Sequence, residues 1–550
     1  MAPDYIPWQL ATLFEAVADR IPDHLVLVQG QVRRTYREFE QRASQLAAAL
    51  ADMGLEPDGK VAIYMTNCPE YKEAEFATAK QRGVSVSVNF RYLDDELVYL
   101  LDNADAEILI YHRRFAERVW AVRERLPQMR HLIEVDDGAP CESVPKAKDY
   151  EFLIGSHAPA PRIPRQEDDM VLVYTGGTTG VPKGVIFTQA ASLRFTTVGY
   201  EFYGLPQPGN AGALVEAASN LARQGHAPVS LVCAPFMHSV GSTLGHTMTV
   251  FMGGTVIMLE GASFDPAEAW RLVERESVTQ IVLVGDAIGR PLLDELDRAS
   301  ADGCPYDISS MQLMASSGVM WSREVKRGLL RHHDMRLIDF FGSSEGGMGM
   351  SVATRAELPD TAVFVARRNV RLLDDDDAEI PWGSGKPGRI AATGDIPHGY
   401  YKDAEKTAAT FKSLNGVLYS IPGDYAKIDA EGRITMLGRG TACINTGGEK
   451  VFAEEVEEAI KRHPAVYDCL VVGIPDPRFG ARVAAVVAPL PDTMINEAEL
   501  QDSVAEQLAD FKVPRTITIV DTIPRAANGK ADYRWALERA AAHAGVAVSE

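Results

Sequence analysis

The most constraining feature of this sequence is a regular alternation of helical and strand patterns. Between residues 36 and 53, apolar side chains recur at helical spacing and share one face, and Gly54 follows as a stop signal. Segment 60–65 then has the apolar character of a buried strand, and a helical pattern over 69–83 leads to a further apolar run at 84–88. Such alternation predicts an α/β fold, in which a sheet carries helices on its faces.

A change in pattern near residue 438 predicts a second, smaller domain. Gly438 and Gly440 mark a hinge, and the roughly 110 residues beyond it suffice for a domain with its own core. Helical and apolar strand segments again follow one another in this part of the chain. We therefore expect a large N-terminal α/β domain of several subdomains over residues 1–437 and a small, mobile α+β domain over residues 438–550.

The composition is that of a globular protein of enzyme size. The chain has 550 residues, 46% hydrophobic and 24% charged, which excludes disordered, fibrous and small disulfide-stabilised classes. Its 55 Lys and Arg residues against 76 Asp and Glu residues give a formal net charge of -21. Because this charge repels nucleic acids and anionic lipid surfaces, we expect neither as a partner.

The N-terminal sequence, which does not fit a signal peptide, and the spacing of the cysteines both indicate the cytoplasm. The first 24 residues lack the basic start and apolar run of a signal peptide, and no apolar stretch approaches the ~18 residues of a membrane span. The cysteines lie far apart with no C-x-x-C pair, so we expect reduced thiols within the core. These cysteines are Cys68, Cys141, Cys233, Cys304, Cys443 and Cys469.

Residues 174–184 (YTGGTTGVPKG) predict a phosphate-binding loop between two apolar strands. Glycines allow close approach of the backbone to a phosphate, threonines supply hydroxyl donors, and a lysine supplies charge. A Walker loop is excluded, since Pro182 and Gly184 flank the lysine where Gly and Ser or Thr are required. A glycine-rich hairpin without a ligand is the alternative. The candidate phosphate contacts are Thr175, Gly176, Gly177, Thr178, Thr179, Gly180 and Lys183.

Residues 342–346 (GSSEG) satisfy the G-x-S-x-G pattern of an α/β-hydrolase, with Ser344 as the nucleophile. That motif requires a helix directly after the serine. Three glycines follow within five residues, and each costs ~1 kcal/mol inside a helix. We therefore expect no helix here and no hydrolase, although the alternative stays open at this stage.

Taken in order, the motifs resemble those of the adenylate-forming superfamily, which includes acyl-CoA synthetases, adenylation domains and luciferases. The phosphate loop matches except that Gly176 replaces the usual serine, and residues 340–345 match the aromatic-G-x-T-E motif with Ser344 in place of threonine. Segments 419–424 and 524–530 are similar to the family's Y-x-T-G-D and C-terminal G-K motifs. The resemblance covers nearly the whole chain and implies the family's two-domain fold.

The resemblance implies how this chain would bind ATP and Mg2+. Lys183 and the phosphate loop would hold the β- and γ-phosphates, Glu345 would hold Mg2+, and Asp424 would accept hydrogen bonds from the ribose hydroxyls. Thr175, Lys183, Glu345 and Lys530 form the implied catalytic set, with Lys530 meeting the α-phosphate. The further nucleotide contacts would be Ser316, Ser317, Gly318, Phe340, Phe341, Gly342, Ser343, Ser344 and Arg439.

The resemblance also implies an acyl pocket and a tunnel for coenzyme A. The pocket would be lined by His238, Val240, Gly241, Gly318 and Gly342, and the tunnel by Gly447, Gly448 and Glu449. Taken singly, several of these residues have plainer interpretations. Asp424 fits a turn, Arg439 and Lys530 fit a solvated surface, and His238 fits the core.

The chain departs from the family at the hinge. Thr441 stands where Asp or Lys is usual, and Asn445 stands where a lysine is common. Domain rotation or thioester formation would then use other contacts. The matches that concern ATP are unaffected.

The resemblance implies an ATP-dependent acyl-CoA ligase that works through an acyl-adenylate and releases AMP and pyrophosphate. Segments 88–92 and 399–411 are similar to bacterial enzymes that act on fatty acids and steroid side chains, so we expect a bulky, hydrophobic carboxylic acid as substrate. The alternatives are an adenylation enzyme that loads a carrier protein, a hydrolase, or a non-catalytic nucleotide-binding protein. A homodimer is a further expectation.

Overall fold

The computed structural model describes residues 5–176, 182–261, 263–319, 321–359, 363–439, 443–446, 449–476, 480–491, 493–525 and 531–546. Within these residues the largest sheet has 15 strands. Its first part runs in the order β2-β1-β11-β10-β12-β13-β14, and the strands from β1 to β14 are parallel. The bounds are β1 Leu25–Gln29, β2 Val32–Thr35, β10 Val229–Val232, β11 Thr255–Met258, β12 Gln280–Leu283, β13 Leu313–Ser317 and β14 Arg336–Ser343.

The same sheet continues through antiparallel strands in the order β15-β16-β23-β22-β18-β21-β20, with β17 paired to β18. The change of direction occurs at the hairpin between β14 and β15. These strands are β15 Gly346–Ala353, β16 Val363–Ala366, β17 Val370–Leu373, β18 Gly388–Ala392, β20 Phe411–Leu414, β21 Val417–Ser420, β22 Asp424–Ile428 and β23 Arg433–Arg439.

A second parallel sheet, in the order β4-β3-β5-β6-β7, confirms the predicted alternation at the start of the chain. Its strands are β3 Lys60–Tyr64, β4 Val84–Ser87, β5 Ala106–His112, β6 His131–Val135 and β7 Lys148–Asp149. Three further strands form a small sheet in the order β19-β9-β8, with bounds β8 Met170–Gly176, β9 Pro182–Thr188 and β19 Gly399–Tyr400. This small sheet links residues that are far apart in the sequence.

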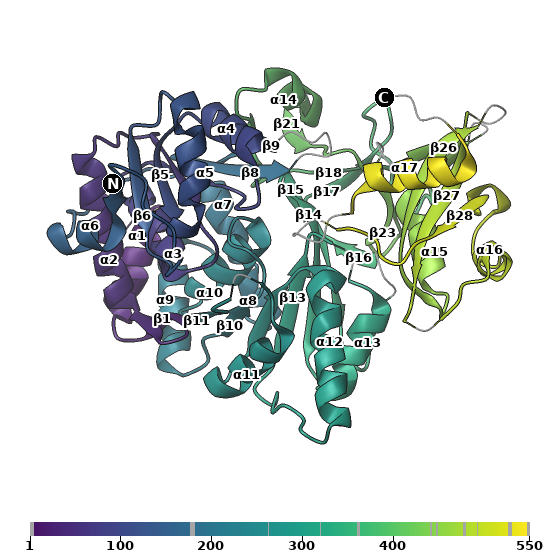
Figure 1. Cartoon of the computed structure of the whole chain (residues 1–550), viewed down its shortest axis with the longest axis horizontal. Helices are drawn as coiled ribbons and strands as arrows, with labels where there is room; N and C mark the ends of the chain where they lie inside the picture. Colours follow the sequence, from purple (N-terminus) through teal and green to yellow (C-terminus); the bar gives the residue numbers. More distant parts are fainter. Residues whose placement is uncertain are drawn as a thin grey trace.

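Helices cover the sheets on both sides (Figure 1). Helix α2 begins at a capping box, in which Thr35 and Glu38 satisfy each other's backbone N–H groups. The helices of the large part are α1 Leu10–Arg20, α2 Tyr36–Asp52, α3 Pro69–Lys80, α4 Asp94–Asn103, α5 Ala116–Val122, α6 Tyr150–Ser156, α7 Gln189–Thr196, α8 Gly199–Phe202, α9 Ala211–Arg223, α10 Met248–Val250, α11 Pro266–Glu276, α12 Gly285–Ala301, α13 Arg323–His332 and α14 Ala404–Thr410.

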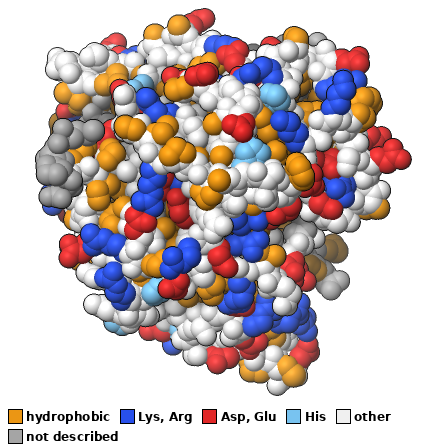
Figure 2. Space-filling model, turned by 90° about the vertical axis from the view of Figure 1, so that its left-hand side faces the viewer, with side chains coloured by type: hydrophobic (Ala, Val, Ile, Leu, Met, Phe, Trp, Pro, Cys, Tyr) orange, Lys and Arg blue, Asp and Glu red, His pale blue; other side chains and the backbone are white. Residues whose placement is uncertain are grey.

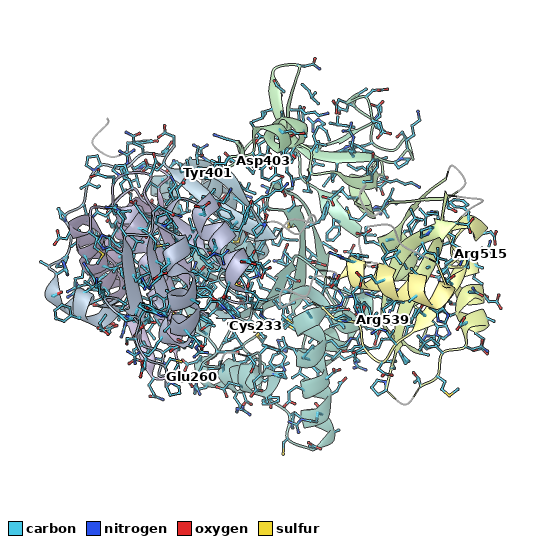
Figure 3. All side chains as sticks on the ribbon, turned by 45° about the horizontal axis from the view of Figure 1, so that its top comes forward. Cys233, Glu260, Tyr401, Asp403, Arg515 and Arg539 are labelled. Carbon is cyan, nitrogen blue, oxygen red and sulfur yellow. The ribbon has the colours of Figure 1, made fainter. Side chains whose placement is uncertain are left out.

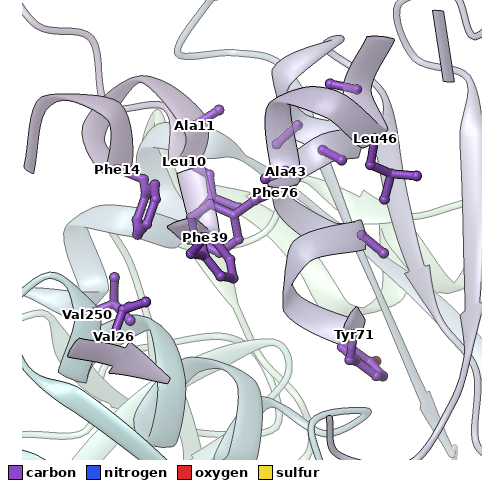
Figure 4. Close-up of a cluster of buried hydrophobic side chains, with 14 of the residues drawn as sticks. Leu10, Ala11, Phe14, Val26, Phe39, Ala43, Leu46, Tyr71, Phe76 and Val250 are labelled. Carbon is purple, nitrogen blue, oxygen red and sulfur yellow. The ribbon is translucent and has the colours of Figure 1, made fainter. Parts of the chain in front are cut away.

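An aromatic cluster anchors the N-terminal helices to one another. The rings of Phe14, Phe39 and Phe76, from α1, α2 and α3, lie 4.9–5.2 Å apart in edge-to-face contacts and are fully buried (Figure 4). Contacts of this geometry add about 0.5–1.5 kcal/mol each beyond area burial. Val250 in α10 joins the same core, so the cluster ties the first helices to the large sheet.

The residues from 443 onward form a separate sheet in the order β25-β24-β27-β26, with β28 paired to β27. Val451, Ile460 and Val487 belong to its own buried core, which together with the large part bears out the predicted mixed α/β class. Figure 1 shows this unit, coloured from green to yellow, beside the large one. Its elements are β24 Cys443–Thr446, β25 Glu449–Phe452, α15 Ala453–Lys461, β26 Val466–Asp476, β27 Gly480–Pro489, α16 Glu497–Ala505, β28 Thr516–Ile519 and α17 Tyr533–Ala544.

The prediction that the cysteines lie in the core is wrong for two of them. In the described residues Cys68 and Cys469 are buried and Cys233 is half-buried, but Cys141 and Cys304 are exposed. Spacing excludes pairing but carries no information on burial, since both exposed cysteines stand in loops between periodic segments.

None of the helices in the described ranges is both long and apolar enough to span a bilayer. One face of the molecule, shown in Figure 2, mixes acidic and basic side chains with scattered apolar ones.

Candidate active site

The predicted phosphate loop joins two adjacent strands of an antiparallel hairpin. Strand β8 ends at Gly176, strand β9 starts at Pro182, and Thr175 lies opposite Lys183. Gly177, Thr178, Thr179 and Gly180 lie outside the described residues. The hairpin therefore places Thr175 and Lys183 side by side at the base of the loop.

Lys183 faces a segment that comes from the far end of the large part. Strand β19 pairs with β9, with Tyr400 opposite Val185. The chain then turns into α14, and the Lys183 Nζ atom lies 3.7 Å from Oδ2 of Asp403. Figure 3 shows Asp403 and Tyr401 together at this junction.

Glu345 lies at the tip of the β14–β15 hairpin. Gly342 pairs with Gly347 and Ser343 with Gly346, which leaves Ser344 and Glu345 as the turn. A Cβ atom at Gly342 would lie 2.9 Å from the carbonyl oxygen of Gly346, so the tight hairpin requires glycine there. The turn holds the Glu345 carboxylate beyond the ends of both strands.

The hydrolase alternative fails on this geometry. A nucleophile elbow needs a strand, a sharp turn and a helix, but Ser344 is followed by strand β15. The predicted absence of a helix after Ser344 is confirmed.

Tyr400 fixes the orientation of the Glu345 carboxylate. The Tyr400 hydroxyl donates to Oε1 of Glu345 at 2.7 Å, and the tyrosine ring is buried against Phe411 at a centroid distance of 5.5 Å. Because the ring is held by packing, its hydroxyl has little freedom to move. Among the described residues no cluster of three His, Cys, Asp or Glu side chains could hold a metal ion. A single carboxylate fits Mg2+, which usually takes its remaining ligands from phosphates and water.

The two phenylalanines before Gly342 pack into different clusters. Phe340 packs against Phe202 at a centroid distance of 5.0 Å, and Phe341 packs against Phe364 at 5.3 Å. Phe340 is buried and Phe341 is half-buried. The ring available to flank a base is therefore that of Phe341.

Residues 316–318 end strand β13, next to β14. The Ser316 hydroxyl is fully buried and accepts a hydrogen bond from the Gly285 N–H at 2.8 Å. Ser317 donates to the Phe340 carbonyl at 3.0 Å, and Gly318 has a φ of +92°. The two serine side chains thus hold neighbouring backbone, while the left-handed conformation at Gly318 disfavours any side chain.

Of the predicted acyl residues, Val240 and Gly241 belong to a π-helix, η3 (Val240–Thr247), and His238 lies two residues before it, whereas Gly342 belongs to the β14–β15 hairpin. A Cβ atom on Gly318 would come 3.7 Å from Val240, so these two residues face each other. A Cβ atom on Gly241 would come 2.3 Å from the Pro235 carbonyl oxygen, so the backbone there requires glycine. π-Helices are uncommon and often mark functional sites.

His238 lines a cavity of about 90 Å³ between α3, β4, β8 and η3. Its walls combine apolar residues such as Val173 and Phe236 with serines, threonines and Glu75. Behind Glu75 the fully buried Lys72 ammonium contacts the Glu75 carboxylate at 2.6 Å. The wall is more polar than the glycine and serine positions alone predict.

Asp424 is the first residue of β22, is 6% exposed, and lies opposite Arg439 of β23. The strand pairing brings these two predicted ribose contacts together at one end of the sheet. The Arg439 side chain lies outside the described part.

The remaining predicted residues belong to the small C-terminal unit. Gly447, Gly448 and Lys530 lie outside the described residues, as does the Glu449 side chain. Glu449 pairs with Thr446 across the β24–β25 hairpin. On either side of residues 526–530, Arg525 and Ala531 form a bridge, and the Arg525 guanidinium donates twice to Asp468, each time at 2.8 Å.

Sequence reasoning missed Tyr400, Asp403 and Lys406, which surround Lys183 and Glu345. Lys406 lies with its Nζ atom 4.9 Å from the Tyr400 ring centroid. Burial, followed by the neighbouring Lys183, lowers the pKa of Lys406 to about 8. All three residues lie in segment 399–411, which carries part of the family resemblance, and this position is the sequence signal that could have identified them as candidate site residues.

Comparison with known proteins decides the family. The pattern of the AMP-binding enzyme family matches residues 14–401, and that of the AMP-binding enzyme C-terminal domain matches residues 455–530. The chain belongs to the AMP-binding enzyme family. The recognition made on the motifs is thereby confirmed.

Curated relatives of this AMP-binding enzyme align over nearly its full length. A Mycolicibacterium smegmatis enzyme, named as a CoA ligase for medium- and long-chain fatty acids and for 3-oxocholest-4-en-26-oate, is 41% identical over 96% of this chain and 95% of its own. A Rhodococcus rhodochrous 3-oxocholest-4-en-26-oate CoA ligase is 40% identical, with 96% and 95% covered.

Solved structures of AMP-binding enzymes share the fold. The anthranilate CoA ligase AuaEII in complex with anthranoyl-AMP has a TM-score of 0.83 at 20% identity, covering 98% of this chain and 99% of its own. ATP-bound MatB from Rhodopseudomonas palustris has a TM-score of 0.79 at 24% identity, covering 96% and 99%.

Proposed function

We propose that this enzyme is an ATP-dependent acyl-CoA ligase for a hydrophobic carboxylic acid, either a fatty acid or a steroid side-chain carboxylate. The observation that carries the proposal is about 40% identity, over 96% of the chain, to ligases named for such acids. The products are the CoA thioester, AMP and pyrophosphate.

The first half-reaction joins the substrate carboxylate to the α-phosphorus of ATP and expels pyrophosphate. Thr175 and Lys183, paired across the β8–β9 hairpin, bind the leaving phosphates. Glu345, oriented by Tyr400, is the carboxylate that holds Mg2+, which supplies charge neutralisation between the phosphates when bound. Asp424 binds the ribose hydroxyls, and Lys530 meets the charge that develops at the α-phosphate.

The second half-reaction transfers the acyl group from AMP to the thiol of coenzyme A. The attacking thiolate forms the thioester bond, and the bond to the AMP oxygen breaks. The C-terminal unit turns so that Gly447, Gly448 and Glu449 border the thiol tunnel. Lids that rearrange between half-reactions are common among enzymes.

The acyl group occupies the region around His238, Val240 and Gly318. Of the predicted acyl residues only His238 lines the cavity of about 90 Å³. This cavity holds only a small part of a long chain, so the walls toward Val240 and Gly318 must separate when substrate binds. Each buried CH2 group contributes ~0.8 kcal/mol, which favours a bulky acid once the pocket has opened.

The cytoplasm is the compartment that fits best, because the described cysteines are free thiols. A homodimer stays a prediction from the sequence, and light scattering would settle the mass in solution.

The test is an assay of a panel of acids with ATP, Mg2+ and coenzyme A, in which mass spectrometry measures the CoA thioester formed. Acetate, octanoate, palmitate and a steroid side-chain carboxylate form the panel. We expect kcat/KM to be highest for the bulky acids. Preference for acetate would contradict the proposed substrate class.

A further inference from the structure

Beside the phosphate hairpin, the Asp403 carboxylate contacts the ammonium group of one lysine, Lys183, and the backbone N–H of another, Lys406. Asp403 caps helix α14, and its Oδ1 atom accepts a hydrogen bond from the backbone N–H of Lys406 at 2.9 Å. Its Oδ2 atom lies 3.7 Å from Nζ of Lys183 on β9. This capping hydrogen bond uses only the backbone N–H of Lys406, so the Lys406 side chain takes no part in the cap.

The Lys406 side chain points back toward the catalytic carboxylate. Its Nζ atom lies over the Tyr400 ring, 4.9 Å from the centroid, and the hydroxyl of that ring donates to Glu345. A lysine on an exposed helix gains rotamer freedom by extending into solvent, so a position against Tyr400 has a cost in entropy.

The local charge balance favours a multiply charged anion. Burial, followed by the neighbouring Lys183, disfavours the charged form of Lys406, which is why the pKa of Lys406 falls to about 8. Asp403 and Glu345 offset this charge in part. A triphosphate between the two ammonium groups would relieve their repulsion.

We propose that Lys406 is a second cation of the phosphate site, which together with Lys183 binds the β- and γ-phosphates of ATP and the pyrophosphate that leaves. The proposal rests on the proposed function for the identity of the nucleotide. No proton moves in this step, and Lys406 acts by charge alone while the bond between the α-phosphorus and the bridging oxygen breaks.

Lys402 provides a matched control on the same segment. Its ammonium contacts Asp105 at 2.8 Å on an exposed surface, away from Glu345. The experiment compares Lys406→Ala, Lys406→Arg and Lys402→Ala by calorimetric titration with inorganic tripolyphosphate and by the KM for ATP in acid-dependent pyrophosphate exchange.

We expect Lys406→Ala to raise the Kd for tripolyphosphate and the KM for ATP about tenfold, as the loss of one charged hydrogen bond does. Lys406→Arg should restore most of the affinity, and Lys402→Ala should match the wild type. The KM for the acid should not change in any variant. Equal affinities for wild type and Lys406→Ala would overturn the proposal.

The wild-type protein gives an independent test that needs no variant. Lys406 is surrounded by Lys183 on β9, by Tyr400 on β19, by Asp403 at the start of α14 and by Glu345 in the β14–β15 turn. Because Lys406 loses its charge above pH 8, affinity for tripolyphosphate should fall between pH 7 and 9, and less so in Lys406→Arg. A flat profile, or the same fall in Lys406→Arg, would contradict the role. Tripolyphosphate binding requires no acid, so this result stands even if no acid supports exchange and the proposed function fails.

Discussion

The role that we propose for Glu345 depends on how its carboxylate is held, and the Tyr400 hydroxyl is its hydrogen-bond donor. The hydroxyl donates at 2.7 Å from a ring fixed by packing, so the carboxylate is oriented before any ligand binds. Orientation of this kind counts because a displaced charge loses much of its effect in the transition state.

Tyr400→Phe should therefore raise the Mg2+ concentration needed for half-maximal activity and lower kcat about tenfold, as expected for loss of one hydrogen bond to a charged group. Folding should be preserved, because the ring still packs on Phe411. Tyr401→Phe is the control, since its hydroxyl bonds to the exposed Asp105. If the activity of the Tyr400→Phe enzyme depended on Mg2+ concentration as the wild type does, the proposal that Tyr400 orients Glu345 would be wrong.

Asp424 provides a second test at the residue scale. Asp424→Ala should raise the KM for ATP, because two ribose hydroxyls lose a charged acceptor worth roughly 1.5–3 kcal/mol. A thermal melt should show that the variant folds. The KM for ATP is measured by steady-state kinetics at varied ATP concentration. An unchanged KM would show that Asp424 does not bind the ribose.

At the scale of elements, local patterns predicted the early helices and strands well. Helix α2 carries its own capping box, and α3 carries proline at its start, so both are encoded in adjacent residues. The π-helix η3 and the contact of β19 with β9 were not predicted. Neither has a local signal, because the first depends on packing around Gly241 and the second joins distant segments.

The same limit explains which site residues the sequence could identify. Neighbouring residues in the sequence form motifs that predict the chemistry of Lys183, Glu345 and Asp424. Tyr400 and Lys406 acquire their roles only when β19 and α14 are placed against the β8–β9 hairpin. Residues of this second kind require the tertiary structure.

The contact of Arg525, five residues before Lys530, with Asp468 can be tested. Arg525 donates twice to Asp468 of β26. Arg525→Ala should slow adenylation several-fold while leaving transfer from a supplied acyl-adenylate nearly unchanged. Arg515→Ala, which breaks an exposed pair with Asp510 in the same unit, should affect neither step. Equal loss of both half-reactions in Arg525→Ala would indicate a general folding defect instead.

In the whole molecule, the proposed two-step reaction requires the C-terminal unit to serve two reactions in two orientations. We propose that Lys530 acts only in the first reaction, so Lys530→Ala should lower the adenylation rate by ~10² to 10³. Affinity for ATP and transfer from a supplied acyl-adenylate should be largely retained. Single-turnover assays of each half-reaction make the comparison, and parallel loss of both would refute the assignment.

Pyrophosphate release from ATP and a bulky acid, measured with and without coenzyme A, tests whether the enzyme is an acyl-CoA ligase. We expect a burst close to one equivalent per enzyme without coenzyme A, since the acyl-adenylate stays bound. With coenzyme A we expect continuous turnover that yields AMP, pyrophosphate and thioester in equal amounts. Pyrophosphate release that is independent of the acid, or a burst that coenzyme A does not convert into turnover, would contradict an acyl-CoA ligase.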